Sequence, residues 1–374
     1  MRRNLRFAIC DLRLKSQCRA LRARISNLHF ALCILHFAIV FAFAFAFTFC
    51  LAPKPARADD LPPTLDASIS HGLEYLSAQQ NLDGSFGTTQ KPAMTGLSLM
   101  SFLAAGHTPD VGKYGGVVSA AVDFLVSQSQ PDGSFGHNEK PMYGQGIATL
   151  ALAEAYGVES SRPQRKRIAA ALSRAVALIV IAQDVKKQDP YNGGWRYEPT
   201  APDSDLSLSG WNALALRACK DAGIAVPKPA VERAVQFVLK CYLPDPKAFS
   251  YQPAGAAQVG PTGVGVLCLH LLDDGNRKES KEAAQFLRAH PIDDQSQFPY
   301  YGMYYATQAA YQSDDAVWSA VSKATFDKLL KAQTQQDGGW PDTPEGAGGG
   351  RIYTTSLALL TLSIPYRLLP IYQR

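Results

Sequence analysis

The strongest constraint on the fold of this chain is a turn that recurs every 42 to 60 residues. The pentapeptide DGSFG occurs at residues 83–87 and again at residues 132–136, and a related QQDGGW stretch lies near the C-terminus. Aligned on their aromatic residue, six such turns are found, at Phe86, Phe135, Trp195, Phe249, Phe298 and Trp340. A period of this length is typical of proteins that stack copies of one supersecondary unit.

Each turn lies between two helical patterns. The segment before it is amphipathic, as in ISHGLEYLSAQQ, and the segment after it is richer in small residues, as in TGLSLMSFLAAG. No segment shows the sustained period-two alternation of a sheet. We therefore predict six helical hairpins, at about residues 67–110, 117–158, 168–224, 229–275, 279–313 and 320–364.

The hairpins are expected to stack on one another, because a single hairpin cannot bury both of its faces. Six of them can close into a ring, with the small-residue helices on the crowded inside. The fold prediction is an all-α, single (α/α)6 toroid, and an open solenoid is the alternative. A glutamine before four of the turns is predicted to bond the free backbone groups at the helix end: Gln79, Gln128, Gln183 and Gln333.

Residues 1–58 differ in character from residues 59–374. They hold ten of the 37 lysines and arginines and one of the 32 acidic residues, so 27 basic and 31 acidic residues remain after them. That acidic balance argues against a nucleic-acid partner. Residues 30–52 are almost wholly apolar, and small residues follow at Ala56 and Ala58.

This leader predicts a signal peptide or an uncleaved signal anchor, with residues 59–374 exported to the periplasm or outside, or anchored facing outward. The FAFAFAF run also leaves the true translation start open. Three cysteines follow the leader, Cys219, Cys241 and Cys268. An odd number of cysteines does not indicate a disulfide framework, so we expect these three to be small buried hydrophobic residues. With neither HExxH nor CxxC in the chain, no metal and no cofactor are predicted.

The first unit carries Gly72-x-x-Tyr75-Leu76 followed by Gln80, Gly84 and Phe86. This spacing resembles the QW repeat of squalene and oxidosqualene cyclases, whose double-ring toroid is shared as a single ring by protein prenyltransferase β subunits. The likeness covers all six units and implies the toroid. YYGMYYATQAAYQ and GRIYTTSLALLTL also resemble exported bacterial proteins known only by their prenyltransferase/squalene-oxidase repeats.

The third unit, GGWRYEPTAPDSDLSLSGW, is similar to the cyclase stretch that holds a DxDD motif. The resemblance places the protonating acid at Asp205 and the first aspartate at Asp203, whereas Leu206 departs from the motif. The zinc site of prenyltransferases has no match, because Thr354 follows Tyr353 where that family has histidine.

Aromatic residues of units three, five and six are predicted to line a central funnel with these carboxylates: Trp195, Tyr197, Trp211, Tyr301, Tyr304, Tyr305 and Tyr353. Their faces would stabilise a carbocation or stack on a sugar, and core packing is the plainer interpretation. For Asp203 and Asp205 the plainer interpretation is helix capping.

Three functions remain open. The resemblance implies a protein that binds or transforms an isoprenoid or other hydrophobic ligand, with Asp205 as general acid; as an enzyme it would be a metal-independent isomerase, lyase or transferase. The second is a non-catalytic binding or scaffold module of the cell envelope, with an envelope protein as partner. The third is a carbohydrate-active α/α-barrel enzyme, in which paired carboxylates would act on a sugar.

Overall fold

The computed structural model of the chain describes residues 63–372 except 137–140, 274, 294–295 and 347. The predictions for the leader, residues 1–58, lie outside the described residues. The chain divides into two compact units, Met1–Asp60 and Leu61–Arg374. All of the described residues belong to the second unit.

The described part of this unit contains twelve α-helices in six consecutive pairs. The first helices of the pairs are α2 (Pro63–Ala78), α4 (Gly115–Gln128), α6 (Arg162–Asp184), α8 (Lys228–Lys240), α10 (Lys278–Ala289) and α12 (Asp315–Ala332). The second helices are α3 (Lys91–Ala104), α5 (Pro141–Val158), α7 (Leu206–Asp221), α9 (Val259–Leu272), α11 (Pro299–Gln312) and α13 (Gly350–Leu362).

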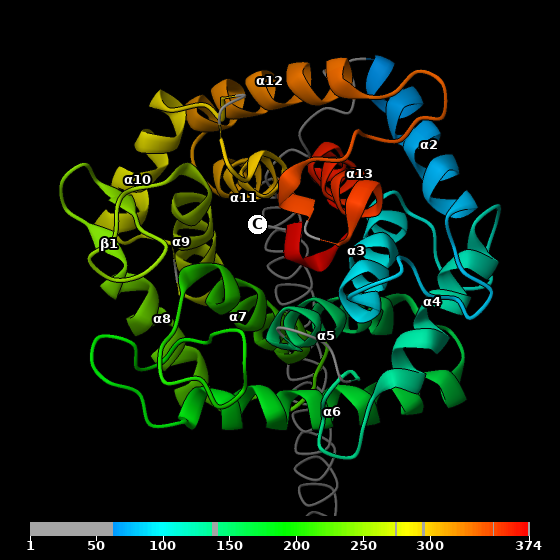
Figure 1. Cartoon of the computed structure of the whole chain (residues 1–374), viewed down its shortest axis with the longest axis horizontal. Helices are drawn as coiled ribbons and strands as arrows, with labels where there is room; N and C mark the ends of the chain where they lie inside the picture. Colours follow the sequence, from blue (N-terminus) through cyan, green and yellow to red (C-terminus); the bar gives the residue numbers. More distant parts are fainter. Residues whose placement is uncertain (1–62, 137–140, 274, 294–295, 347, 373–374) are drawn as a thin grey trace, which may run out of the picture. The chain divides into compact units, whose positions relative to one another are not determined.

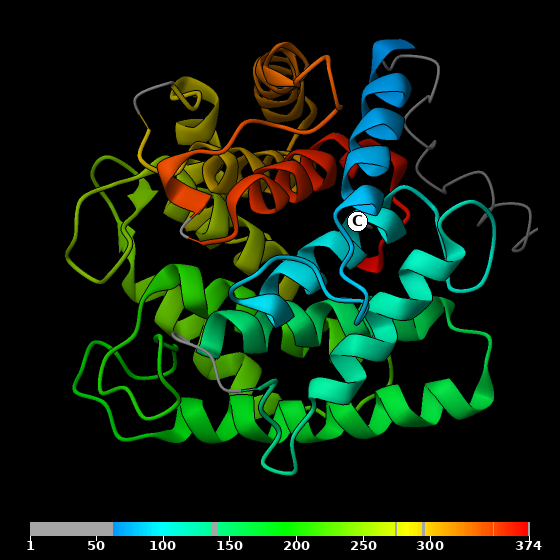
Figure 2. The same ribbon diagram turned by 45° about the vertical axis from the view of Figure 1, so that its right-hand side comes forward.

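The second helices form a closed inner ring. Each packs against the next from α3 to α13, and α13 packs against α3. The first helices surround them, as Figure 1 shows face on and Figure 2 shows obliquely. The predicted α/α toroid of six hairpins is confirmed, and the open solenoid is wrong.

Small residues let the inner helices approach closely. At four successive contacts a Cβ added to a glycine would lie 3.0 Å or less from the neighbouring helix. These contacts are Gly96 with Ile147, Gly146 with Trp211, Gly210 with Val264 and Gly263 with Ala306. Between α13 and α3 serine replaces glycine, since the Ser98 and Ser356 hydroxyls lie 3.2 Å apart.

In four of the six pairs the recurring turn packs against the outer helix of the next pair. Its glycine has positive φ, and an added Cβ would lie 2.2–2.4 Å from a backbone oxygen of that helix. The contacts are Gly84 with Ala120, Gly133 with Arg174, Gly193 with Arg233 and Gly338 with His71. Because His71 belongs to α2, the last of these contacts closes the ring.

Glutamine amides tie the same turns, in part as predicted. The Gln183 amide donates to the carbonyls of Gly193 and Ala230, and Gln333 does the same for Gly338 and for Ser68 of α2. In the first pair the donor is Gln80 rather than Gln79, and in the second pair it is Gln145 of α5 rather than Gln128.

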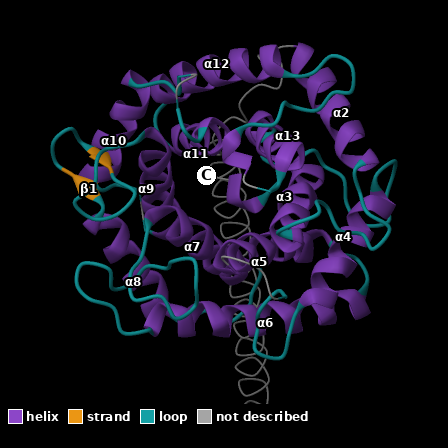
Figure 3. Ribbon diagram, viewed as in Figure 1, coloured by secondary structure: helices purple, strands orange, loops and turns teal. Residues whose placement is uncertain are grey.

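The fourth pair replaces the glycine turn by a short hairpin. Strands β1 (Tyr242–Leu243) and β2 (Ala248–Phe249) pair antiparallel and are the only strands named in the described residues (Figure 3). Cys219, Cys241 and Cys268 are buried and unbridged, as predicted. None of the helices in the described residues has the length and apolar character needed to cross a membrane.

The chain ends by crossing the side of the ring where the inner helices terminate. The 3₁₀ helices η3 (Ile364–Tyr366) and η4 (Pro370–Tyr372) pack against α11, α13 and α7. Leu369 and Ile371 are buried there, and the Ile371 amide donates to the carboxyl of Glu154 on α5. The opposite side, where the inner helices begin, carries the predicted carboxylates.

Candidate functional site

The predicted aspartates lie where the loop of the third pair enters α7. Trp195 and Asp205 form an antiparallel bridge, in which the Asp205 amide donates to the Trp195 carbonyl at 2.9 Å. The next amide, of Leu206, donates to the Tyr251 carbonyl at 2.8 Å. Asp205 is the N-cap of α7, since its Oδ1 accepts the Leu208 amide at 2.9 Å.

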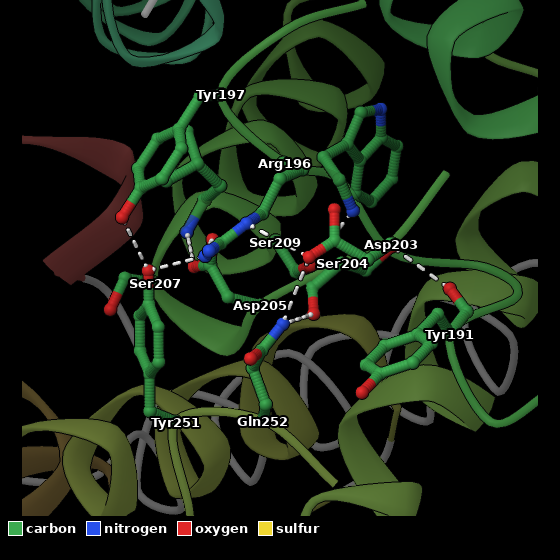
Figure 4. A network of polar contacts seen from close by, with 12 residues as sticks. Tyr191, Arg196, Tyr197, Asp203, Ser204, Asp205, Ser207, Ser209, Tyr251 and Gln252 are labelled. Carbon is green, nitrogen blue, oxygen red and sulfur yellow. Dashed lines mark hydrogen bonds and ion pairs between the residues drawn. The ribbon is translucent and has the colours of Figure 1, made fainter. Parts of the chain in front are cut away.

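Arg196 is the centre of a polar network around this cap (Figure 4). Its Nη1 lies 2.7 Å from Oδ2 of Asp205 and donates to the Tyr251 hydroxyl at 2.7 Å. Its Nε lies 3.2 Å from Oδ2 of Asp203. The Tyr197 and Tyr251 hydroxyls are 2.8 Å apart, and the guanidinium lies over the Tyr197 ring at 4.3 Å. The Arg196 side chain thus makes ion pairs, hydrogen bonds and an aromatic contact at once.

The two aspartates have different settings. The Asp205 side chain is fully buried, and that of Asp203 is 37% exposed. Burial raises the pKa of Asp205, while the Leu208 amide and Arg196 oppose the rise. Both oxygens of Asp205 accept hydrogen bonds from N–H groups, which is the geometry of a carboxylate. Asp203 is the carboxylate that solvent reaches.

Tyrosines from other pairs reach the same end of the ring. The Tyr301 hydroxyl of α11 lies 2.6 Å from Oγ of Ser207 on α7. Its ring passes over Gly260 of α9, where an added Cβ would come within 2.6 Å of it. The rings of Tyr143 and Tyr197 lie 6.0 Å apart. Half-buried rings from two inner helices, α5 and α11, therefore lie beside residues of the third pair at this end of the ring.

A third carboxyl, that of Glu345, lies where α13 begins. It belongs to the 3₁₀ helix η2 (Pro344–Gly346), which packs against α13. Its Oε1 accepts the Tyr300 amide at 2.8 Å, and its Oε2 is buried without a partner. Burial raises the pKa of Glu345 to about 7, and burial together with the nearby Glu345 raises the pKa of Tyr353. Tyr353 is half-buried.

Four of the predicted aromatic residues lie in the core instead. Trp195 fills the seam between α6 and α7, where its Nε1 donates to the Ile179 carbonyl at 2.8 Å. Trp211 stacks on Tyr304 at 5.8 Å and meets Tyr305 edge-on at 5.4 Å. All four are 4% exposed or less, so the prediction that they line a funnel is wrong for them and core packing holds.

The structure thus gathers Asp203, Asp205, Tyr197, Tyr301 and Tyr353 at one end of the ring. Sequence reasoning missed four further residues there, Tyr143, Arg196, Tyr251 and Glu345. Among the described residues no group of three or more His, Cys, Asp or Glu side chains is placed to hold a metal ion.

No protein-family model matches this chain, and no curated protein matches it. Solved structures do share its fold. The GH76A α-1,6-mannanase from Salegentibacter sp. HEL1_6 superposes with a TM-score of 0.59 at 10% identity, over 81% of this chain and 99% of its own. Cellobiose 2-epimerase from Bacillus thermoamylovorans B4167 superposes with a TM-score of 0.56 at 12% identity, over 80% of this chain and 99% of its own.

A type II terpene cyclase from Scytonema also matches, with a TM-score of 0.36 at 16% identity, over 82% of this chain and 98% of its own. A score that low carries no argument for a shared function. The likeness to the mannanase and the epimerase shows an α/α-toroid fold, and a fold alone does not fix an activity.

Proposed function

We propose that the ring of residues 61–374 binds a carbohydrate at the end where its inner helices begin. The observation that carries the proposal is the Arg196 network, in which Asp203, Asp205 and the Tyr251 hydroxyl are held beside half-buried tyrosine rings. The solvent-reached carboxylate of Asp203 and the ring of Tyr197 are its two contact groups for the ligand.

A sugar matches both kinds of group. Its C–H faces pack on aromatic rings, and its hydroxyls donate to carboxylates and exchange hydrogen bonds with phenols. Binding sites of this type combine apolar rings with a few placed polar groups. Tyr197, Tyr251 and Tyr301 each supply a ring and a hydroxyl at this end of the ring.

An isoprenoid fits this end less well. It would cover Asp203 and the tyrosine hydroxyls without offering them partners, and an unpaired polar group removed from water costs about 1–3 kcal/mol. Alkene protonation requires Asp205 to carry a proton, whereas both of its oxygens accept N–H groups. The carbohydrate interpretation therefore has more support than the general-acid one.

Two proteins of the same fold act on sugars according to their names, the α-1,6-mannanase and cellobiose 2-epimerase. The mannanase has been solved with α-1,6-mannotriose. We propose the same ligand class for this chain, outside the cytoplasm, where the predicted leader would deliver it.

The test is a binding titration of the full chain with α-1,6-mannotriose, cellobiose and geranylgeraniol. Sugar binding is expected, and Asp203→Asn should weaken it roughly tenfold, because a charge-assisted hydrogen bond contributes about 1.5–3 kcal/mol. Glu198→Gln is the matched control, since Glu198 is an exposed carboxylate of the same loop. Binding of geranylgeraniol alone would return the isoprenoid hypothesis, and binding of neither would favour a scaffold role.

A further inference from the structure

Glu345 connects two inner helices at the candidate site. It precedes α13, and its Oε1 accepts the amide of Tyr300 in the first turn of α11. The first amides of a helix have no partner inside that helix, so an acceptor from elsewhere fixes where the helix begins. Glu345 is that acceptor for α11.

The surroundings of Glu345 hold no counter-charge. The titratable groups that face it are Tyr300 and Tyr301 of α11 and Tyr353 of α13, and Asp342 is the nearest acid of its own segment. In the described part of the chain it forms no ion pair, and its Oε2 is buried without a hydrogen-bond partner. Burial accordingly raises the pKa of this carboxyl to about 7, against the Tyr300 and Tyr301 amides.

The residue that follows Tyr300 reaches the other half of the site. Tyr301 crosses Gly260 and places its hydroxyl 2.6 Å from Oγ of Ser207, two residues after Asp205. A shift of the first turn of α11 would move this hydroxyl away from Ser207. The position of the Tyr301 hydroxyl thus depends on the first turn of α11, whose Tyr300 amide donates to Glu345.

We propose that Glu345 is a positioning residue: its neutral carboxyl holds the first turn of α11 where Tyr301 meets Ser207, and its ionisation weakens carbohydrate binding. The proposal rests on the proposed function for the identity of its ligand. The link between Glu345 and Tyr301 does not depend on any ligand.

The direction follows from burial. A neutral carboxyl fits a site with no cation and an unpartnered Oε2, whereas a carboxylate there lacks the donors that water would give it. As the pH rises through about 7, the contact with α11 is expected to loosen and the hydroxyl of Tyr301 to lose its place. By linkage, each unit of difference between the pKa of Glu345 in the ligand-free protein and its pKa in the carbohydrate-bound protein changes the affinity about tenfold.

The experiment follows Tyr301 and the affinity separately in the full chain. The protein is labelled with 3-fluorotyrosine, the Tyr301 resonance is assigned by its loss in Tyr301→Phe, and both the resonance and α-1,6-mannotriose binding are measured from about pH 5.5 to 8.5. In the unchanged protein the resonance should titrate near pH 7, and the affinity should fall roughly three- to tenfold over that range.

Variants separate Glu345 from other titrating groups. In Glu345→Gln, which keeps shape and acceptor, both profiles should become flat; in Asp342→Asn, an acid of the same segment, both should persist. Tyr301→Phe should lose most of the pH dependence of affinity.

A resonance that titrates equally in Glu345→Gln, or fails to titrate in the unchanged protein, overturns the proposal. A titrating Tyr301 with no sugar binding at any pH overturns the proposed function and the affinity half of this inference, and upholds the positioning half.

Discussion

Two buried carboxyls of the candidate site have opposite settings. Asp205 is fully buried but accepts Arg196 and the Leu208 amide, whereas Glu345 has one amide donor and one unpartnered oxygen. Environments that separate two carboxyls in this way are typical of sites with divided roles. Here one carboxyl anchors the Arg196 network, and the other sets the start of a neighbouring helix.

At this scale, Arg196→Met is expected to lower the free energy of unfolding by about 3–5 kcal/mol at pH 8, because it leaves the buried Asp205 without its cation. The loss should shrink near pH 4, where Asp205 can become neutral. Urea unfolding at both pH values measures it. Arg167→Met removes an exposed pair with Asp123 and should cost no more than about 1 kcal/mol. Equal losses in the two variants would contradict the buried-charge explanation for Asp205.

The sequence places Asp203, Asp205, Tyr197 and Tyr301 close together once the helical pairs are recognised, because they precede or begin inner helices. It does not reveal that Tyr251, from the loop of the next pair, completes the Arg196 network. The spacing of aromatic residues on α11 was equally ambiguous, since i, i+3, i+4 positions turn inward whether they meet a ligand or the core.

At the scale of elements, the seams between pairs depend on glycine. The turn glycine combines a positive φ with a close backbone contact, so two separate costs arise when a side chain is added. Because Gly338 meets His71 of α2, one such seam joins the last pair to the first.

Gly338→Ala should therefore cost about 2–4 kcal/mol of unfolding free energy, about 1 from the left-handed backbone and the rest from the contact with His71. Gly223→Ala is the matched control, because Gly223 has φ of 80° and nothing within 4 Å of an added Cβ, against φ of 79° at Gly338. Thermal and urea unfolding compare them. Similar losses in both variants would mean that the closing seam is not tight.

The pairs were predictable from the sequence because helical periodicity and the aromatic turn recur together. The fourth turn was located by its aromatic residue, Phe249, but its form was not predicted, since Phe249 lies in the β1–β2 hairpin and no glycine precedes it there. The glutamines at the seams were only half predictable: sequence position cannot tell Gln79 from Gln80, or reveal that Gln145 of an inner helix replaces Gln128.

At the scale of the whole unit, the six pairs close on themselves and residues 364–372 cover one side of the ring. Periodicity predicts the closure, but it is silent on residues 364–372, which follow no helical pattern. The covered side contains Glu154, 2% exposed, whose pKa burial raises to about 8. Its Oε2 has no partner.

The pH dependence of stability has a definite sign here. The Glu154 carboxyl has an ordinary pKa of 4.5 and about 8 in the fold, so its contribution is complete below pH 4.5 and is lost as the pH rises to 8. Each unit of difference corresponds to about 1.4 kcal/mol. Glu154→Gln should flatten the fall in urea midpoints over this range.

Glu345 adds a fall in the free energy of unfolding of the same sign, which ends near pH 7. The double variant Glu154→Gln with Glu345→Gln should therefore have a flatter pH profile of stability than either single variant. Asp123→Asn, at an exposed acid, serves as the control. An unchanged profile in the double variant would show that other groups govern the pH response.

The segment of η3 and η4 has one more consequence. Leu369 and Ile371 are buried on the side where the inner helices end, so residues 364–372 cover that side of the ring. A carbohydrate that binds beside Asp203, as proposed above, would therefore approach and leave on the Asp203 side of the ring.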